Sequence, residues 1–214
     1  MEETRCEEIV NTSTHAIGAL LAAAGGGVLI VFAAQRGSVW HVVACSVYGA
    51  TLVAMFAASC IYHVVQSPRV KHVLNIIDHC AIYLVIAGTY TPFTLTVLRG
   101  GLGWTLFRLI WGLALLGIVL KTFFIDRWRM ISTACYVIMG WLCIIAFKPL
   151  FVSLQVGGFV LVLLGGVLYT AGVLFYLWNR LPYNHAVWHL FVLAGGVLQY
   201  LSVLLYVVPL LRAT

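Results

Sequence analysis

Charged residues are scarce in this chain. Asp, Glu, Lys and Arg make up only 8% of its 214 residues, whereas an ordinary soluble domain carries about 25%. Hydrophobic residues make up 63%, and the mean hydropathy is +1.06. Too few charges remain to cover a water-facing surface, so the composition excludes a soluble domain and indicates an integral membrane protein.

The long apolar runs lack the alternation of polar and apolar residues that marks the strands of a membrane barrel. In hydrocarbon every backbone N–H and C=O must be satisfied within a helix or a closed barrel. Residues 16–34, 42–62 and 156–178 are almost continuously apolar. Each is long enough to cross a hydrocarbon core of roughly 30 Å as a helix. The sequence therefore predicts an all-α membrane bundle.

The sequence also shows no basic patch, no CxxC pair and no basic secretory leader. Lys and Arg are scattered singly among short connectors, so the net charge of +6 does not indicate a nucleic-acid-binding patch. The six cysteines form no CxxC pair and lie mostly in apolar runs, so we interpret them as small buried residues. The N-terminal residues carry glutamates instead of the basic leader of a secretory signal, so we expect the first span to be retained.

Charged residues, Pro and Gly divide the chain into seven apolar segments. The predicted spans are 13–34, 39–65, 72–98, 103–124, 129–147, 153–178 and 183–210. Residues 1–12 are predicted to form a short cytoplasmic segment, and residues 13–214 a single seven-helix transmembrane domain. Lys and Arg are more frequent on the N-terminal side, which favours a cytoplasmic N-terminus and an outside C-terminus.

Small residues recur at four-residue spacing in two of the spans, and such stripes allow helices to approach closely. They comprise Gly18, Ala22 and Gly26 in the first span, and Ala50, Ala54 and Ala58 in the second. We expect both stripes to face neighbouring helices.

Polar and ionisable residues are rare inside the predicted spans. An ionisable residue there costs at least about 2.5 kcal/mol on insertion scales, so each is a candidate for a function. The candidates are His15 in the first span, Ser59 and His63 in the second, Asp78 and His79 in the third, and His185 and His189 in the seventh. Odd spans begin, and even spans end, on the side of the N-terminus. All the candidates therefore lie at one face of the membrane, the cytoplasmic face in the predicted orientation.

The spacing of the histidines suggests a metal site. His185 and His189 are four residues apart, so on a helix they project from one face and can share an ion. Together with His63 they would hold zinc with the fourth tetrahedral position open to water. A bound zinc ion brings the pKa of its water to roughly 7, and Asp78 could orient that water or take its proton.

Plainer interpretations exist for the same residues. A lone HxxxH pair often arises by chance. Asp78 could instead pair with Lys71 or with a neighbouring histidine as a structural link. His79 is adjacent to Asp78 and points to a different face, so it is better explained as an interhelical hydrogen-bonding residue.

Four stretches of the chain resemble the hemolysin III family, the bacterial branch of the progestin and adipoQ receptor superfamily. They are EEIVNTSTH at 7–15, SCIYH at 59–63, DH at 78–79 with AGTYTP at 87–92, and HAVWH at 185–189. The resemblance implies a seven-helix bundle in the bacterial inner membrane that holds zinc. It assigns the zinc to His63, His185 and His189, places Ser59 and Asp78 near the zinc-bound water, and makes Glu8, Asn11 and His15 candidates for supporting the ligands. It also implies kinship with alkaline ceramidases, which hydrolyse a lipid amide.

Three functions compete. The first is a zinc-dependent membrane hydrolase of a lipid amide or ester, with Asp78 as base or water orienter and Ser59 binding the carbonyl or the water. The second is a non-enzymatic sensor or regulator of lipid state, whose structural zinc would need a fourth protein ligand such as His15 or Asp78. The third is a pore-forming hemolysin, although no span carries a polar stripe along its full length. Membrane lipids are the expected partners, nucleic acid is not, and a homo-oligomer is left open.

Overall fold

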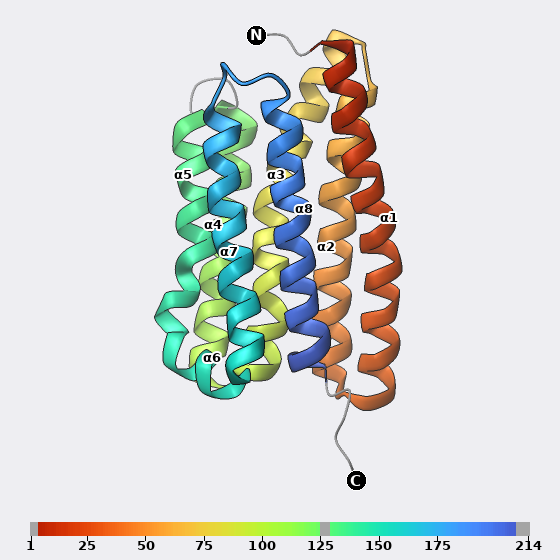
Figure 1. Ribbon diagram of the computed structural model, residues 1–214. Helices are drawn as coiled ribbons and strands as arrows, with labels where there is room; N and C mark the ends of the chain where they lie inside the picture. The colour runs from red at the N-terminus through yellow and green to blue at the C-terminus, as the bar shows by residue number, and fades with distance from the viewer. Residues whose placement is uncertain (1–3, 125–128, 209–214) are drawn as a thin grey trace.

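The computed structural model describes residues 4–124 and 129–208. Within these residues the chain is a bundle of helices without strands (Figure 1). Seven of its helical segments are long and apolar enough to cross a membrane. The predicted all-α bundle with seven spans is therefore confirmed.

The first four spans are single helices, one of which changes its winding near its end. They are α1 (Arg5–Arg36), α2 (Val39–Val64), α3 (Pro68–Pro92) with the π-helical turn Phe93–Val97, and α4 (Gly101–Phe124). Pro92 has no N–H to continue the α-helical ladder. The winding changes there, and the Leu98 N–H donates to the Phe93 carbonyl at 2.8 Å.

The last three spans complete the bundle. The fifth comprises α5 (Arg129–Gly140), the 3₁₀ turn Trp141–Ala146 and α6 (Phe147–Ser153). The sixth is α7 (Gln155–Leu177), and the seventh is α8 (Asn184–Ser202) with the π-helical turn Val203–Val207. The fifth span therefore continues past its predicted end at residue 147, because the chain returns to α-helix after the 3₁₀ turn.

The first helix starts earlier than its apolar run. Thr4 caps α1 with its hydroxyl oxygen, which accepts the Glu7 N–H, while the Glu7 carboxylate accepts the Thr4 N–H at 2.8 Å. This reciprocal capping box satisfies N–H groups that the first turn leaves without partners. Residues 5–12 are consequently helical, and the predicted boundary between N-terminal segment and transmembrane domain falls inside α1.

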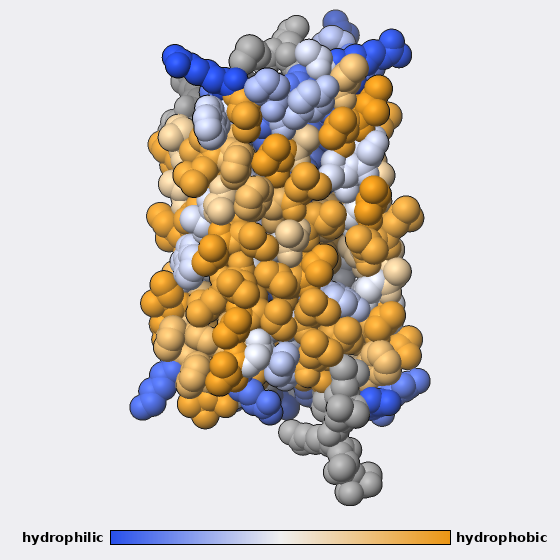
Figure 2. Space-filling view, in the orientation of Figure 1, coloured by the Kyte–Doolittle hydropathy of each residue, from blue (hydrophilic) through white to orange (hydrophobic). Residues whose placement is uncertain are grey.

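The surface of the bundle matches a hydrocarbon environment. Figure 2 shows a broad hydrophobic belt, with hydrophilic residues gathered at its two ends. Large apolar side chains such as Leu20, Phe123 and Leu174 are more than two-thirds exposed on this belt. Such exposure is unfavourable in water and favourable against lipid. The protein is therefore a multi-pass membrane protein.

Helix packing brings the first and the last helix side by side. The last helix, α8, contacts both α1 and α7, and α2 contacts both α1 and α3. The small-residue stripe of the first span is buried as predicted, and the Gly26 and Gly49 backbones approach each other. The stripe predicted for the second span is wrong for Ala50 and Ala54, which are exposed, whereas Ala58 is half-buried and packs against the core. As a result the starts of α1, α3 and α8 and the end of α2 lie at the same end of the bundle (Figure 1).

Candidate metal centre

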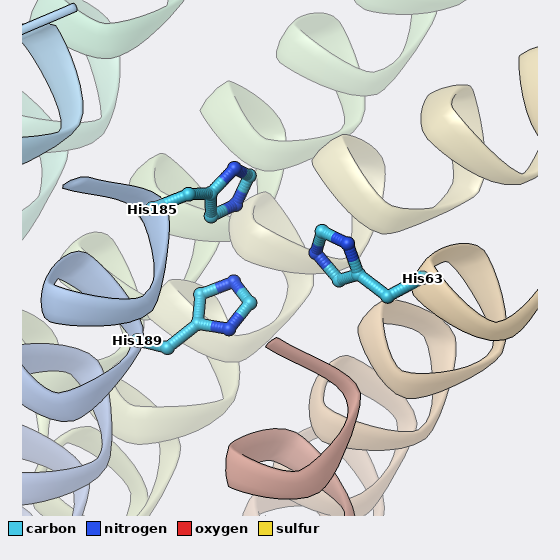
Figure 3. A group of neighbouring side chains, drawn as sticks. All are labelled: His63, His185 and His189. Carbon is cyan, nitrogen blue, oxygen red and sulfur yellow. The ribbon is translucent and has the colours of Figure 1, made fainter. Parts of the chain in front are cut away.

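Three histidines converge between α2 and α8. His63 lies in the last turn of α2, and His185 and His189 lie in the first two turns of α8. One ring nitrogen of each comes within 4.8 Å of the others. In Figure 3 a nitrogen of every ring points into the space between the three side chains. This group can hold a metal ion.

The start of α8 is fixed from outside the helix. Tyr183, just before α8, adopts a left-handed conformation with φ of 56°, which residues other than glycine rarely adopt. Its backbone N–H donates to the Glu7 carboxylate of α1 at 3.0 Å. The Asn184 amide donates to the Phe175 carbonyl of α7 at 3.3 Å. These bonds tie the turn that carries His185 to two other helices.

Glu8 holds the ring of His63. One carboxylate oxygen of Glu8 lies 2.6 Å from Nδ1 of His63, and the other oxygen forms an ion pair with Lys71 of α3. Because Nδ1 contacts the carboxylate, Nε2 is the nitrogen of His63 that is left for a metal. A carboxylate behind a histidine is the usual support for such a ligand, since it fixes the tautomer and the direction of the ring.

Asp78 and Ser59 belong to the wall of a cavity that two of the three histidines also line. Both side chains are buried, and both line the same cavity as His185 and His189. In residues 4–124 and 129–208, no ion pair or hydrogen bond of the Asp78 carboxylate is found. Lys71, which the sequence offered as a structural partner for Asp78, pairs with Glu8 instead. A buried carboxylate therefore faces the cavity next to the histidine group.

His15 lies against the group without belonging to it. Its ring stacks on His189 with 3.5 Å between centroids and meets Phe56 edge-on at 5.1 Å. It is buried, and across the described part of the chain neither ring nitrogen has a hydrogen-bond partner. Asn11, one turn earlier on the same face of α1, is fully buried as well.

His79 serves a different purpose from its neighbour Asp78. Its Nδ1 contacts the Asn75 carbonyl at 2.8 Å, and its Nε2 contacts the hydroxyl of Tyr176 in α7 at 3.4 Å. The Tyr136 hydroxyl of α5 donates to the His79 carbonyl at 3.0 Å. The prediction of an interhelical hydrogen-bonding residue is confirmed.

A cavity of about 1200 Å³, its mouth included, leads from the histidines into the bundle. Its walls come from α1, α2, α3, α5, α7 and α8 and are mostly apolar and aromatic, with Tyr136, Tyr169 and Tyr176 among them. Neither this cavity nor the Glu8–Lys71 pair was predicted from the sequence. Glu8 and Lys71 are 63 residues apart, and the sequence offered Lys71 as a partner of Asp78 instead.

The model of the family described as "Haemolysin-III related" matches residues 4–200. The chain belongs to this family. It is 50% identical to "Hemolysin-3" of Bacillus cereus, over 95% of this chain and 93% of that protein. It is 48% identical to "Hemolysin-3 homolog" of Bacillus subtilis strain 168, over 94% of this chain and 95% of that protein.

A more distant similarity reaches beyond the bacterial members. The chain is 26% identical to human "Monocyte to macrophage differentiation factor", over 94% of this chain and 84% of that protein. The resemblance inferred from the four sequence stretches is thus confirmed. Seven apolar helices and the bacterial relatives indicate a multi-pass membrane protein, which in bacteria lies in the cell membrane.

Proposed function

We propose that this protein is a zinc-dependent membrane hydrolase that cleaves an amide or ester bond of a lipid. The observation that carries the proposal is a group of three histidines, two of which line an apolar cavity together with the buried carboxylate of Asp78. Neither part would suffice alone. A metal group without a cavity indicates only a structural ion, and a cavity without reactive groups indicates only a binding site.

The donor set suits zinc. Imidazole nitrogen is a common zinc ligand, and three protein ligands with one open position are typical of catalytic zinc. His63, His185 and His189 would hold the ion. When bound there, zinc would polarise a carbonyl oxygen and supply a water with a pKa of roughly 7.

The neighbouring side chains have the chemistry that hydrolysis requires. We assign Asp78 as the group that orients the attacking water and accepts its proton. The Ser59 hydroxyl donates a hydrogen bond to the carbonyl oxygen of the bond that is cleaved. Glu8, which contacts Nδ1 of His63, would keep the other ring nitrogen directed at a bound ion.

The depth of the site fits a lipid substrate. The ligands lie in the last turn of α2 and the first two turns of α8, near one end of the hydrophobic belt. The amide and ester bonds of membrane lipids lie at this same level, between headgroups and acyl chains. Water can therefore reach the scissile bond while the acyl chain stays in an apolar environment.

The geometry is less favourable to a structural zinc in a lipid sensor. Structural zinc sites almost always have four protein ligands. In the described ranges the metal group contains three residues, and His15 stacks on His189 instead of joining the group. An open coordination position favours the hydrolase.

Lipid hydrolysis is tested directly with purified protein in liposomes that contain either a ceramide or a phosphatidylcholine. We expect release of free fatty acid from at least one of them, measured by mass spectrometry. A chelator should abolish the release, and added zinc should restore it. His72→Gln, which removes an exposed histidine at the same end of the bundle, serves as the control and should retain full activity. Zinc-loaded protein that releases no fatty acid from either lipid would contradict the proposal.

Glu8→Gln is expected to weaken zinc binding by about 10- to 100-fold, the usual effect of removing a carboxylate that supports a metal-bound histidine. The substitution keeps the size of the side chain but removes the charge that holds Nδ1 of His63. Competition with a chelator of known zinc affinity measures the change. Arg69→Gln, which removes an exposed charge near the same helix end, is the control. Unchanged zinc affinity in Glu8→Gln would show that the carboxylate does not support the ligand.

A further inference from the structure

The main cavity extends deep into the membrane. Its walls reach from His185 to Gln199 along α8. Fourteen residues of α-helix span about 21 Å, which is about two-thirds of a hydrocarbon core of roughly 30 Å. An acyl chain of one membrane leaflet, about 15 Å long, fits within this depth.

A second cavity lies beyond the first. Its empty volume is about 570 Å³, the open space at its mouth included, and its lining residues include the apolar Phe93, Leu98 and Leu150. The two cavities share six lining residues, namely Thr89, Tyr90, Gly140, Trp141, Gly166 and Gln199. Only this layer of residues separates the two spaces.

The three large side chains of this layer, Tyr90, Trp141 and Gln199, form what we call the floor. Each is held by hydrogen bonds within the protein. The Tyr90 hydroxyl donates to the Gly140 carbonyl at 2.8 Å and accepts the Cys143 N–H at 2.8 Å. These bonds attach α3 to the point where α5 changes to the 3₁₀ turn.

The other two floor residues are attached to α7. The Trp141 indole N–H donates to the Thr170 hydroxyl at 2.9 Å, and the Gln199 amide donates to the Val162 carbonyl at 3.0 Å. Because the polar atoms of these side chains bond to the protein, their apolar faces are the parts that can contact a ligand. The floor is therefore a hydrogen-bonded partition with apolar space on both sides.

We propose that the main cavity binds a single saturated acyl chain and that the floor sets the longest chain that fits. The inference rests on the proposed function for the position of the polar end of the lipid at the histidines. A chain that reaches the floor fills the cavity, and a longer one must leave methylene groups outside or displace the floor. The second cavity is the space that longer chains would gain if the floor were opened.

Trp141→Ala is the variant that opens the floor. It removes the largest side chain between the two cavities. Thr170, which loses the indole partner, still donates to the Gly166 carbonyl at 2.8 Å, so no buried hydroxyl is left unsatisfied. Trp104→Ala is the matched control, because Trp104 lines neither cavity.

Gly166→Val tests the floor in the opposite direction. A Cβ added at Gly166 would lie 3.7 Å from the Trp141 ring, an ordinary contact distance, so the backbone can accept a side chain there. The added methyl groups thicken the floor and shorten the main cavity. This variant keeps the inference testable even if Trp141→Ala fails to fold.

The experiment measures binding of saturated fatty acids, from octanoate to docosanoate, to zinc-loaded protein by native mass spectrometry in competition. For wild type and Trp104→Ala we expect affinity to rise by about tenfold for every two methylene groups up to a limiting length, and then to rise no further. Trp141→Ala should move the limit to longer chains, and Gly166→Val to shorter ones. The same limit in all four proteins, or no retained fatty acid in any, would overturn the inference.

The outcome for the floor is separable from the outcome for hydrolysis. If the limiting length shifts as expected while no lipid is cleaved, the inference about the cavity stands and the proposed hydrolase is wrong. If lipids are cleaved but the limit does not move, the hydrolase stands and the role of the floor is wrong.

Discussion

Replacement of both His185 and His189 by alanine is expected to reduce bound zinc from about one ion per chain to none and to abolish lipid hydrolysis. The two residues supply two of the three ligands, and His63 alone holds zinc too weakly to survive purification. Elemental analysis of the purified variant measures the metal, and fatty-acid release measures the activity. The expected loss of turnover is complete, because no other group in the site lowers the pKa of a water molecule.

The control for this double variant must remove imidazoles without touching the site. His41 and His72 are suited to it, because both lie outside the histidine group and away from the main cavity. The variant His41→Ala with His72→Ala should keep its zinc and its activity. Zinc retained at one ion per chain after loss of His185 and His189 would show that the ion is bound elsewhere.

Asp78→Asn is expected to lower turnover by about 10²- to 10⁴-fold, the usual contribution of a general base, while zinc stays bound. The amide has nearly the same shape as the carboxylate but cannot accept the proton of the attacking water. Asp78 is not one of the three grouped ligands, so its replacement should leave the metal content unchanged. Steady-state kinetics together with zinc analysis of the same preparation separates the two effects.

Ser59→Ala provides a graded comparison for Asp78→Asn. The alanine removes one hydrogen-bond donor near the carbonyl, so we expect a smaller loss of turnover than for Asp78→Asn. If Asp78→Asn loses its zinc, the carboxylate is a ligand, which is one form of the structural-zinc alternative. If Asp78→Asn keeps both zinc and full turnover, Asp78 has no part in the reaction.

The sequence was sufficient to predict the spans and the histidine group because both depend on strong local signals. A run of about twenty apolar residues has few alternatives to a membrane helix. The four-residue spacing of His185 and His189 places both on one helix face. The alternation of span direction then places His63 at the same level. These three arguments need no knowledge of which helices are neighbours.

The contacts that support and enclose the site depend on helix neighbours, and sequence patterns do not specify these. Glu8 and His63 are 55 residues apart, and Trp141 and Thr170 are 29 apart. The stripe of Ala50 and Ala54 shows the same limit, since its spacing is suitable for helix packing but the structure turns it outward. Periodicity identifies a helix face, and tertiary packing decides what that face meets.

The orientation of the bundle is a separate prediction. The site lies at the end where α1 begins (Figure 1), and the positive-inside rule assigns that end to the cytoplasm. On this assignment, the proposed hydrolase would act on lipids of the inner leaflet.

X-ray absorption at the zinc edge of the wild-type protein tests the central claim most directly. We predict a four-coordinate ion with three imidazole nitrogens at about 2.0–2.1 Å and one oxygen from water. The His185 and His189 double variant, which is expected to lose its zinc, should give no zinc-edge signal. Wild-type protein that contains no zinc after purification and reloading, or whose zinc has no imidazole ligands, would contradict the account.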